Sequence, residues 1–215
     1  MKRDTRTRIL VASLSLFNEK GEPNTTTNEI ANETDISPGN LHYHFHKKSL
    51  LVDALVAEFQ ADVRRALQPP QNGETTLDDF WAFLHLLLEV FTAYRFLMRD
   101  METLVSTYPK VGRALKGLAI ALTAIMQLYI EALRRSAVLA VDDREVPVMC
   151  RNLVVISLFS ERYDEISGAV TSAEASALRI ARSVLGILSP YSSKESSKLI
   201  AALAEHYAES GKTPA

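Results

Sequence analysis

The chain has 215 residues, of which 47% are hydrophobic and 23% charged, and its 24 Lys and Arg against 26 Asp and Glu leave a net charge of −2. This composition is typical of a globular protein, so it excludes a disordered chain and a polycation that holds nucleic acid by bulk charge. The single cysteine, Cys150, excludes an internal disulfide framework and a zinc site built from cysteines, and it fits a reducing compartment.

No stretch of the sequence predicts export or a membrane span. The basic start of the chain is not followed by an uninterrupted apolar core with a cleavage site, so we expect no secretion signal. The most apolar stretches, 80–91 and 117–130, are shorter than the about 18 consecutive apolar residues that a membrane span needs. We therefore expect a soluble, cytoplasmic protein that does not bind a membrane.

The first 67 residues have the apolar period of short helices. A first helix ends at Gly21 and Pro23, and its predicted inward face consists of Ile9, Leu10, Ala12, Ser13, Leu16 and Phe17. Thr26 and Glu29 form a capping box that opens a second helix, with Ile30 and Ala31 inward, ending near residues 34–35. Ser37 and Pro38 are an N-cap and a first helical residue, so they predict a third helix that ends near His46.

The rest of the chain is also helical in period. A helix is expected from about 47 to 67, and the prolines and glycine of 69–73 form the clearest linker. Later helices are expected at 75–96, 97–107, 110–139, 145–168, 172–189 and 193–209. Because no sustained period-2 alternation occurs, the sequence predicts an all-α protein with an N-terminal domain at 1–62 and a larger helical domain at 63–215.

Residues 26–46 have the pattern of a helix-turn-helix, in which the first helix packs across the second and the second projects into a DNA major groove. Ala31 is small where the two helices cross, and Ile30, Ile36, Leu41 and Phe45 provide apolar contacts. The expected outward residues of the second helix are Pro38, Gly39, Asn40, His42, Tyr43 and His44. Asn reads adenine, whereas His and Tyr bond base edges or phosphates, so we expect double-stranded DNA as the partner.

Basic residues lie on both sides of this segment, where the phosphates of a bound duplex would pass. Arg3 and Arg6 precede it, and Lys47 and Lys48 follow at the next helix start. The predicted DNA-binding residues are therefore Arg3, Arg6, Thr26, Thr27, Asn28, Ser37, Pro38, Gly39, Asn40, His42, Tyr43, His44, Lys47 and Lys48.

Residues 6–55 resemble the DNA-binding domain of the TetR family of bacterial transcriptional regulators. The resemblance runs without a gap through Phe17, Gly21, Thr26, Ile30, Ala31, Ser37, Gly39, Leu41, Tyr43, Phe45, Lys48 and Leu51. Two positions depart from the family pattern, because Asp35 replaces the usual glycine of the turn and His42 replaces the usual Tyr. Asp35 is tolerable there because Asp adopts the left-handed conformation. More weakly, 94–109 is similar to a C-terminal domain found in one branch of the family.

The resemblance implies an all-helical homodimer that binds a near-palindromic operator and acts as a ligand-responsive repressor. It also implies a larger domain that often encloses a small effector. Met adapts to irregular volumes and suits an apolar pocket, so the expected effector has apolar character. The candidate pocket residues are Trp81, His85, Glu89, Tyr94, Met98, Met101, Met126 and Tyr129. For His85 and Glu89, one helical turn apart, a hydrogen bond inside the core is the favoured alternative.

Two C-terminal stretches are candidates for the dimer interface. Residues 153–159 and 177–188 are apolar on two helix faces, so one face is expected against the subunit's own core and the other against a second subunit. A fully buried central helix is the alternative.

Other kinds of site have weaker support. His42, His44 and His46 suggest a metal, but no neighbouring carboxylate or thiol completes a ligand set, so we expect no metal and no cofactor. No catalytic motif stands out, and we expect no enzyme activity. Two alternatives stay open: a DNA-binding regulator controlled by a protein partner, and an all-α carrier or enzyme with merely structural N-terminal helices.

Overall fold

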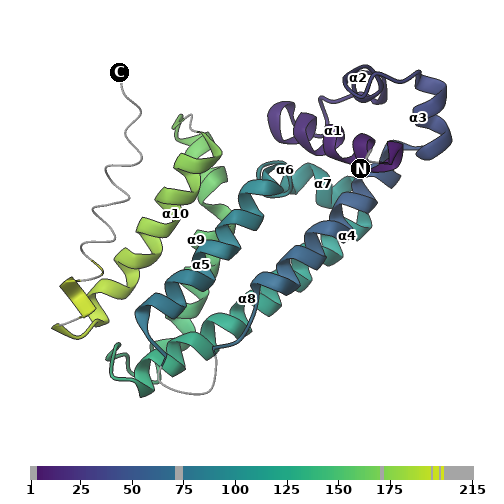
Figure 1. Ribbon diagram of the computed structural model, residues 1–215. Helices are drawn as coiled ribbons and strands as arrows, with labels where there is room; N and C mark the ends of the chain where they lie inside the picture. Colours follow the sequence, from purple (N-terminus) through teal and green to yellow (C-terminus); the bar gives the residue numbers. More distant parts are fainter. Residues whose placement is uncertain (1–3, 71–74, 170–171, 195, 199, 201–215) are drawn as a thin grey trace. The chain divides into compact units, whose positions relative to one another are not determined.

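The computed structural model describes residues 4–70, 75–169, 172–194, 196–198 and 200 (Figure 1). Within these residues the regular structure is helical, apart from one isolated bridge between Leu139 and Ser192, so the prediction of an all-α fold is confirmed. The helices are α1 (Thr5–Lys20), α2 (Thr27–Glu33), α3 (Pro38–His44), α4 (Lys48–Ala66), α5 (Leu77–Ala93), α6 (Arg95–Arg99), α7 (Met101–Thr107), α8 (Pro109–Arg135), α9 (Val146–Ile166) and α10 (Ala173–Leu188), followed by the 3-10 turn η1 (Ser189–Tyr191).

The contacts divide the chain into two units. Unit 1 consists of residues up to 62 together with 94–116, and unit 2 consists of 63–93 together with the residues from 117 onward. The structure therefore groups 94–116 with the N-terminal helices, whereas the sequence places that segment in the larger domain. The chain crosses between units inside α4, between α5 and α6, and inside α8, so α4 and α8 each belong to both units.

The core of unit 1 is built from the apolar faces of short helices. The six residues predicted to face inward from α1 are all buried. The Phe17 ring lies 5.4 Å from that of Phe96, and the Phe59 ring lies 5.4 Å from that of Tyr94. Phe96 and Tyr94 belong to the second segment of the unit, so aromatic burial connects 94–116 to α1 and α4.

The hydrogen bonds that the sequence predicts at helix starts are present in unit 1. Thr26 Oγ1 accepts a hydrogen bond from Glu29 N at 3.2 Å, and Glu29 Oε2 accepts one from Thr26 N at 2.8 Å, which is the predicted capping box. The bond from Thr26 N holds the pKa of Glu29 below its usual value. Asp35 has a φ of 53°, the left-handed conformation expected where it replaces a glycine.

The predicted helices at 75–96 and 97–107 are wrong in their boundaries. In the structure α5 ends at Ala93, and two short helices, α6 and α7, follow on either side of Asp100. Asp100 Oδ2 accepts a hydrogen bond from Glu22 N at 3.0 Å, and Arg99 donates to the carbonyls of Phe17 and Asn18, each at 2.8 Å. We infer that these contacts favour the break, since no Gly or Pro lies in this segment to predict one.

The core of unit 2 is formed by α5, the second part of α8, α9 and α10. The Tyr129 ring stacks on Phe83 with centroids 4.6 Å apart, and α10 packs against both α5 and α9. Cys150 is buried, and this burial raises the pKa of its thiol to about 11, as expected of a small buried hydrophobe. The predicted helix 193–209 lies mostly outside the described residues.

Helices α9 and α10 differ in their outer faces. On α9, Leu153 and Leu158 are buried, whereas Val155 and Phe159 are 46% and 48% exposed, so this helix has the two apolar faces that were predicted. On α10, the buried face contains Val184 and Leu185, but the exposed positions are Arg182, Ser183 and Gly186. The prediction of a second apolar face is therefore wrong for α10, because its outward residues are polar or small.

Among the described residues, α8 is the one helix long and apolar enough to cross a membrane, with a mean hydropathy of 1.4 over 18 residues, 44% of them buried. Its buried side chains form a stripe that includes Leu122, Met126 and Leu133. A stripe of this kind is typical of a helix in the core of a helical bundle.

Candidate nucleic-acid interface

A small apolar contact holds α2 and α3 together. Ile30 and Ala31 of α2 are fully buried, and Leu41 and Phe45 are 2% and 1% exposed. Because Ala31 has only a methyl group, the two helices approach closely where they cross. The contact fixes one face of α3 and leaves the other face to solvent.

The exposed face of α3 is the one predicted from the sequence, except that His44 is half-buried. Ser37 Oγ accepts a hydrogen bond from Asn40 N at 3.2 Å and opens the helix, followed by Pro38 at its first position. Asn40 and His42 are exposed, and Tyr43 is 84% exposed, which is unusual for a large aromatic side chain. The face therefore presents an amide, an imidazole and a phenol outside the core.

Gly39 lies on this face without a structural need for a glycine. A Cβ built at this position would approach only Ser37 Oγ, at 3.9 Å, which is an ordinary contact. Since Gly is about 1 kcal/mol less favourable than Ala inside a helix, the fold itself would favour a larger residue here. The absence of a side chain allows another molecule to approach the backbone of α3.

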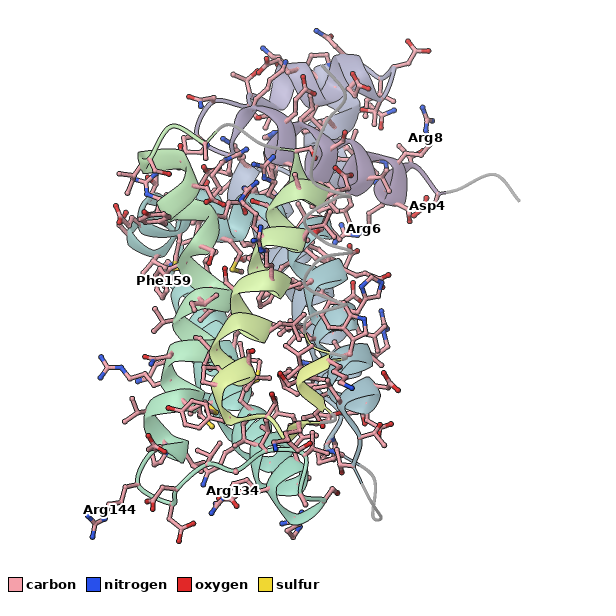
Figure 2. The ribbon with its side chains drawn as sticks, turned by 90° about the vertical axis from the view of Figure 1, so that its left-hand side faces the viewer. Asp4, Arg6, Arg8, Arg134, Arg144 and Phe159 are labelled. Atoms are coloured by element: carbon pink, nitrogen blue, oxygen red, sulfur yellow. The ribbon has the colours of Figure 1, made fainter. Side chains whose placement is uncertain are left out.

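Two arginines of α1 lie beside the helix-turn-helix. The Arg6 guanidinium is 4.3 Å from the centroid of the Phe45 ring, and its Nη1 donates to the His44 carbonyl at 3.5 Å. Arg8 Nη2 donates to the Thr34 carbonyl at 2.5 Å, at the end of α2. Figure 2 labels both side chains near the start of α1. Each arginine places positive charge at the C-terminal end of a helix, beside its last carbonyl groups. A positive charge in this position stabilises the helix end.

The remaining residues that are predicted to contact DNA lie in three places. Thr26, Thr27 and Asn28 lie at the start of α2, with Thr26 engaged in the capping box. Lys47 is exposed in the connection before α4. Arg3 lies outside the described residues.

Lys48 has a different partner from the predicted phosphate. Its Nζ lies 2.8 Å from Glu22 Oε1 and donates a hydrogen bond to the Glu22 carbonyl oxygen at 2.5 Å. The Lys48 side chain is 25% exposed and that of Glu22 is 4% exposed. In this structure the ammonium therefore compensates a buried carboxylate and connects the start of α4 to the loop after α1.

Glu22 is a buried carboxylate that no sequence pattern singled out. Its Oε1 also accepts a hydrogen bond from Tyr108 Oη at 2.5 Å, and its backbone N donates to Asp100. Burial and the adjacent carboxylate raise the pKa of Tyr108 above its usual value, so this hydroxyl stays protonated and donates. These contacts link the loop between α1 and α2 to 94–116 within unit 1.

The three histidines near α3 do not form a metal site. The rings of His42 and His46 are 6.5 Å apart and nearly perpendicular, and the described part of the chain contains no group of three potential metal ligands. This geometry favours imidazoles on a surface over a coordination sphere.

Three of the predicted effector residues line one cavity within unit 2. Trp81, His85 and Glu89 line a cavity of about 320 Å³ between α5 and α10. The others lie elsewhere: Tyr94, Met98 and Met101 belong to unit 1, whereas Met126 and Tyr129 are buried in the core of unit 2.

The favoured interpretation of His85 and Glu89 as a core hydrogen bond is wrong. Their side chains are 60% and 62% exposed, and their 3.3 Å contact between Nε2 and Oε1 lies at the rim of the cavity. A side-chain contact this exposed contributes little to stability.

Comparisons with known proteins agree with this architecture. The family model described as "Bacterial regulatory proteins, tetR family" matches residues 9–55, and the TetR model described as "Bacterial transcriptional repressor" matches residues 58–200. The first match covers the helix-turn-helix, and the second covers most of the remaining chain.

Individual relatives are similar over part or all of the chain. The probable regulator YttP of Bacillus subtilis is 29% identical over 90 residues (42% of this chain and 44% of the relative), and UidR of Escherichia coli K12 is 35% identical over 69 residues (32% and 35%). The aligned part thus spans less than half of either curated relative. A TetR-family regulator from Marinobacter aquaeolei VT8 has a similar structure, with a TM-score of 0.82, 29% identity, and coverage of 96% of this chain and 99% of that one. The chain belongs to the TetR family of bacterial transcriptional regulators.

Proposed function

We propose that this protein is a transcriptional repressor that binds a near-palindromic operator as a homodimer and releases it when a small effector binds. The observation that supports the proposal most is the exposed face of α3. Gly39, Asn40 and Tyr43 lie on this face, and the opposite face of the helix packs into the core. Membership of the TetR family supports the same function. The protein acts by binding and carries out no catalysis.

The chemistry of the face suits the major groove. Asn40 provides an amide that pairs with adenine in a bidentate manner, and His42 and Tyr43 hydrogen-bond to base edges or phosphates. Arg6 and Lys47 flank this face with positive charge, so they supply phosphate contacts and a salt-dependent share of the affinity. Lys48 acts indirectly, because its ammonium holds the start of α4 against Glu22.

The second subunit packs against α9. Along this helix an exposed apolar stripe follows one face, with spacings of three, four or seven residues, and consists of Val148, Val155, Phe159, Tyr163 and Ile166. Phe159 points away from the ribbon in Figure 2. An apolar stripe of this length is costly in solvent and marks a protein interface. Two copies of α9 facing each other bury both stripes in a symmetric contact.

The effector acts through the helices that the two units share. A change in unit 2 is transmitted along α4 and α8, and it alters the distance between the two recognition helices of the dimer. Since successive major grooves have a fixed spacing, a shift of a few ångströms is enough to lower affinity. We expect a coupling free energy of about 1–3 kcal/mol.

Gly39→Ala separates the function of α3 from its stability. The fold has room for the methyl group, so the free energy of unfolding is expected to rise by roughly 0.5–1 kcal/mol. The same methyl group obstructs the approach of DNA to the helix backbone, so operator affinity is expected to fall at least about tenfold, a loss of about 1.4 kcal/mol. Urea unfolding and a mobility shift with operator DNA measure the two effects.

The control for this variant is Gly186→Ala in α10, where a Cβ also meets open space. It is expected to leave operator affinity unchanged. A Gly39→Ala protein that folds more stably and still binds DNA as tightly as the original would show that DNA does not approach this face.

A further inference from the structure

The cavity between α5 and α10 lies within unit 2 and has an apolar wall. Leu88 and Ala181, one from each helix, are buried, and Leu178 is half-buried. The other residues that line the cavity are Trp81, His85, Glu89, Thr92, Ala93, Glu174 and Ala177. Nearly all of the surface that faces the cavity consists of carbon atoms.

The ionisable side chains of the cavity have partners in the fold. His85, Glu89 and Glu174 are exposed, so their polar atoms are in contact with water at the rim. His85 Nε2 lies 3.3 Å from Glu89 Oε1, so these two groups are partners of each other. Glu174 also has an interaction partner within the fold. None of these three groups therefore needs a charged ligand, and the apolar wall decides what the cavity favours.

An aromatic ring extends the apolar wall. The Trp81 indole is half-buried, and its centroid lies 6.4 Å from that of the His85 imidazole, with an angle of 33° between the rings. The contact restricts the orientation of the indole. A tryptophan provides more apolar surface than any other side chain, so it gives the cavity a wide area for packing.

The size and the lining of the cavity exclude large and charged ligands. A volume of about 320 Å³ is at the small end of ligand pockets. An ionised group that leaves water for a wall of carbon atoms loses its hydration without a partner to replace it. Carbon surface, in contrast, gains free energy by leaving water. The cavity therefore favours a small uncharged molecule.

The cavity also includes the end of α5. Thr92 and Ala93 line it and are the last two residues of that helix, and the chain enters unit 1 directly afterwards, at Tyr94. Within unit 1, Arg99 and Asp100 bond to the end of α1 and to the loop that follows it. A molecule in the cavity therefore contacts the chain a few residues before the groups that hold α1.

We propose that this cavity binds a small uncharged molecule with a largely apolar body, and that a molecule of this class is the effector. The role as effector rests on the proposed repressor function, whereas the binding itself does not. The apolar body packs against Leu88, Leu178 and the indole of Trp81, and a polar group such as a hydroxyl stays at the rim in contact with water. Binding displaces the end of α5 and, with it, the segment that bonds to α1.

Three compounds that share one rigid skeleton test the preference for a neutral ligand. At neutral pH, 4-tert-butylbenzyl alcohol is uncharged, 4-tert-butylbenzylamine is a cation and 4-tert-butylbenzoate is an anion. Trp81 is the single tryptophan of the chain and lies in the cavity wall, so its fluorescence reports binding. The alcohol is expected to bind at least about tenfold more tightly than either charged compound, because it loses less hydration.

Substitutions in the wall show whether the alcohol occupies this cavity. Ala177 is half-buried in the wall, so Ala177→Phe fills the space and is expected to weaken binding of the alcohol at least about tenfold. Ala177→Leu fills less of the space and is expected to have an intermediate effect. Ala124→Phe, at an exposed position of α8 outside the cavity, is the matched control and is expected to leave the affinity unchanged. Circular dichroism checks that each variant keeps its helices.

The outcomes separate this inference from the repressor function. The inference would be overturned if a charged compound bound as tightly as the alcohol, if the alcohol left Trp81 fluorescence unchanged, or if a folded Ala177→Phe protein bound the alcohol as before. Release of operator DNA by saturating alcohol is expected in a mobility shift, and binding without release would overturn the role as effector. A protein that binds no DNA in the absence of the alcohol would contradict the repressor function, while the binding measurements would stand.

Discussion

Lys48→Met is expected to lower the free energy of unfolding by about 2–3 kcal/mol, because it leaves the buried Glu22 carboxylate without its cation. This value is below the about 3–5 kcal/mol typical of a fully buried pair, since a quarter of the Lys48 side chain is exposed. Methionine keeps the apolar stem, which lies near the Phe17 ring, so packing changes little. Urea unfolding monitored by circular dichroism measures the loss.

The neighbouring residue supplies the control. Lys47 is exposed, so Lys47→Met is expected to leave stability unchanged, to weaken DNA binding on all sequences alike, and to lower the salt slope by about one per bound subunit. Adding Glu22→Gln to Lys48→Met removes the uncompensated charge and is expected to restore part of the stability. If Lys48→Met unfolds at the same urea concentration as the original protein, the ammonium of Lys48 does not stabilise the fold.

Phe159→Glu is expected to convert the proposed dimer into monomers and to weaken operator binding by at least about a hundredfold. The substitution places a charge in the centre of the apolar stripe on α9, and two such charges meet across a symmetric interface. Once the subunits separate, the second half-site is no longer held at the high effective concentration that a dimer provides. Light scattering gives the mass, and a mobility shift gives the affinity.

Ile120→Glu is the matched control for the dimer interface. Ile120 is 63% exposed on α8, outside the stripe, so the same change there is expected to leave both mass and affinity unchanged. A dimeric Phe159→Glu protein would place the interface on another surface.

The features that the sequence predicted correctly are those that depend on neighbours along the chain. The capping box of Thr26 and Glu29 and the N-cap at Ser37 each follow from residues within three positions, whereas the left-handed Asp35 follows from the family resemblance. The inward face of α1 follows from helical period in the same way. Such local preferences agree with the final structure, so they are visible without it.

The features that it missed depend on residues far apart in sequence. Glu22 and Tyr108 are 86 positions apart, and Arg99 contacts Phe17 across 82 positions, so no local pattern predicts the buried carboxylate or the break at Asp100. The sequence predicts a phosphate contact for Lys48 because it follows the recognition segment at the next helix start, whereas its partner Glu22 is 26 positions away. The exposed position of His85 and Glu89 was missed because their helix is otherwise apolar, and only the packing of α10 shows which side of α5 is covered.

The central claim is that the exposed face of α3 reads DNA sequence, and selection of bound duplexes from random DNA tests it most directly. The protein is expected to enrich a near-palindromic sequence whose half-sites lie about one helical turn apart. The variants Asn40→Ala and Tyr43→Ala are each expected to reduce the preference at particular base pairs, by about 1–3 kcal/mol. No enrichment at low salt, or the same enriched sequence with the same preferences in both variants, would contradict it.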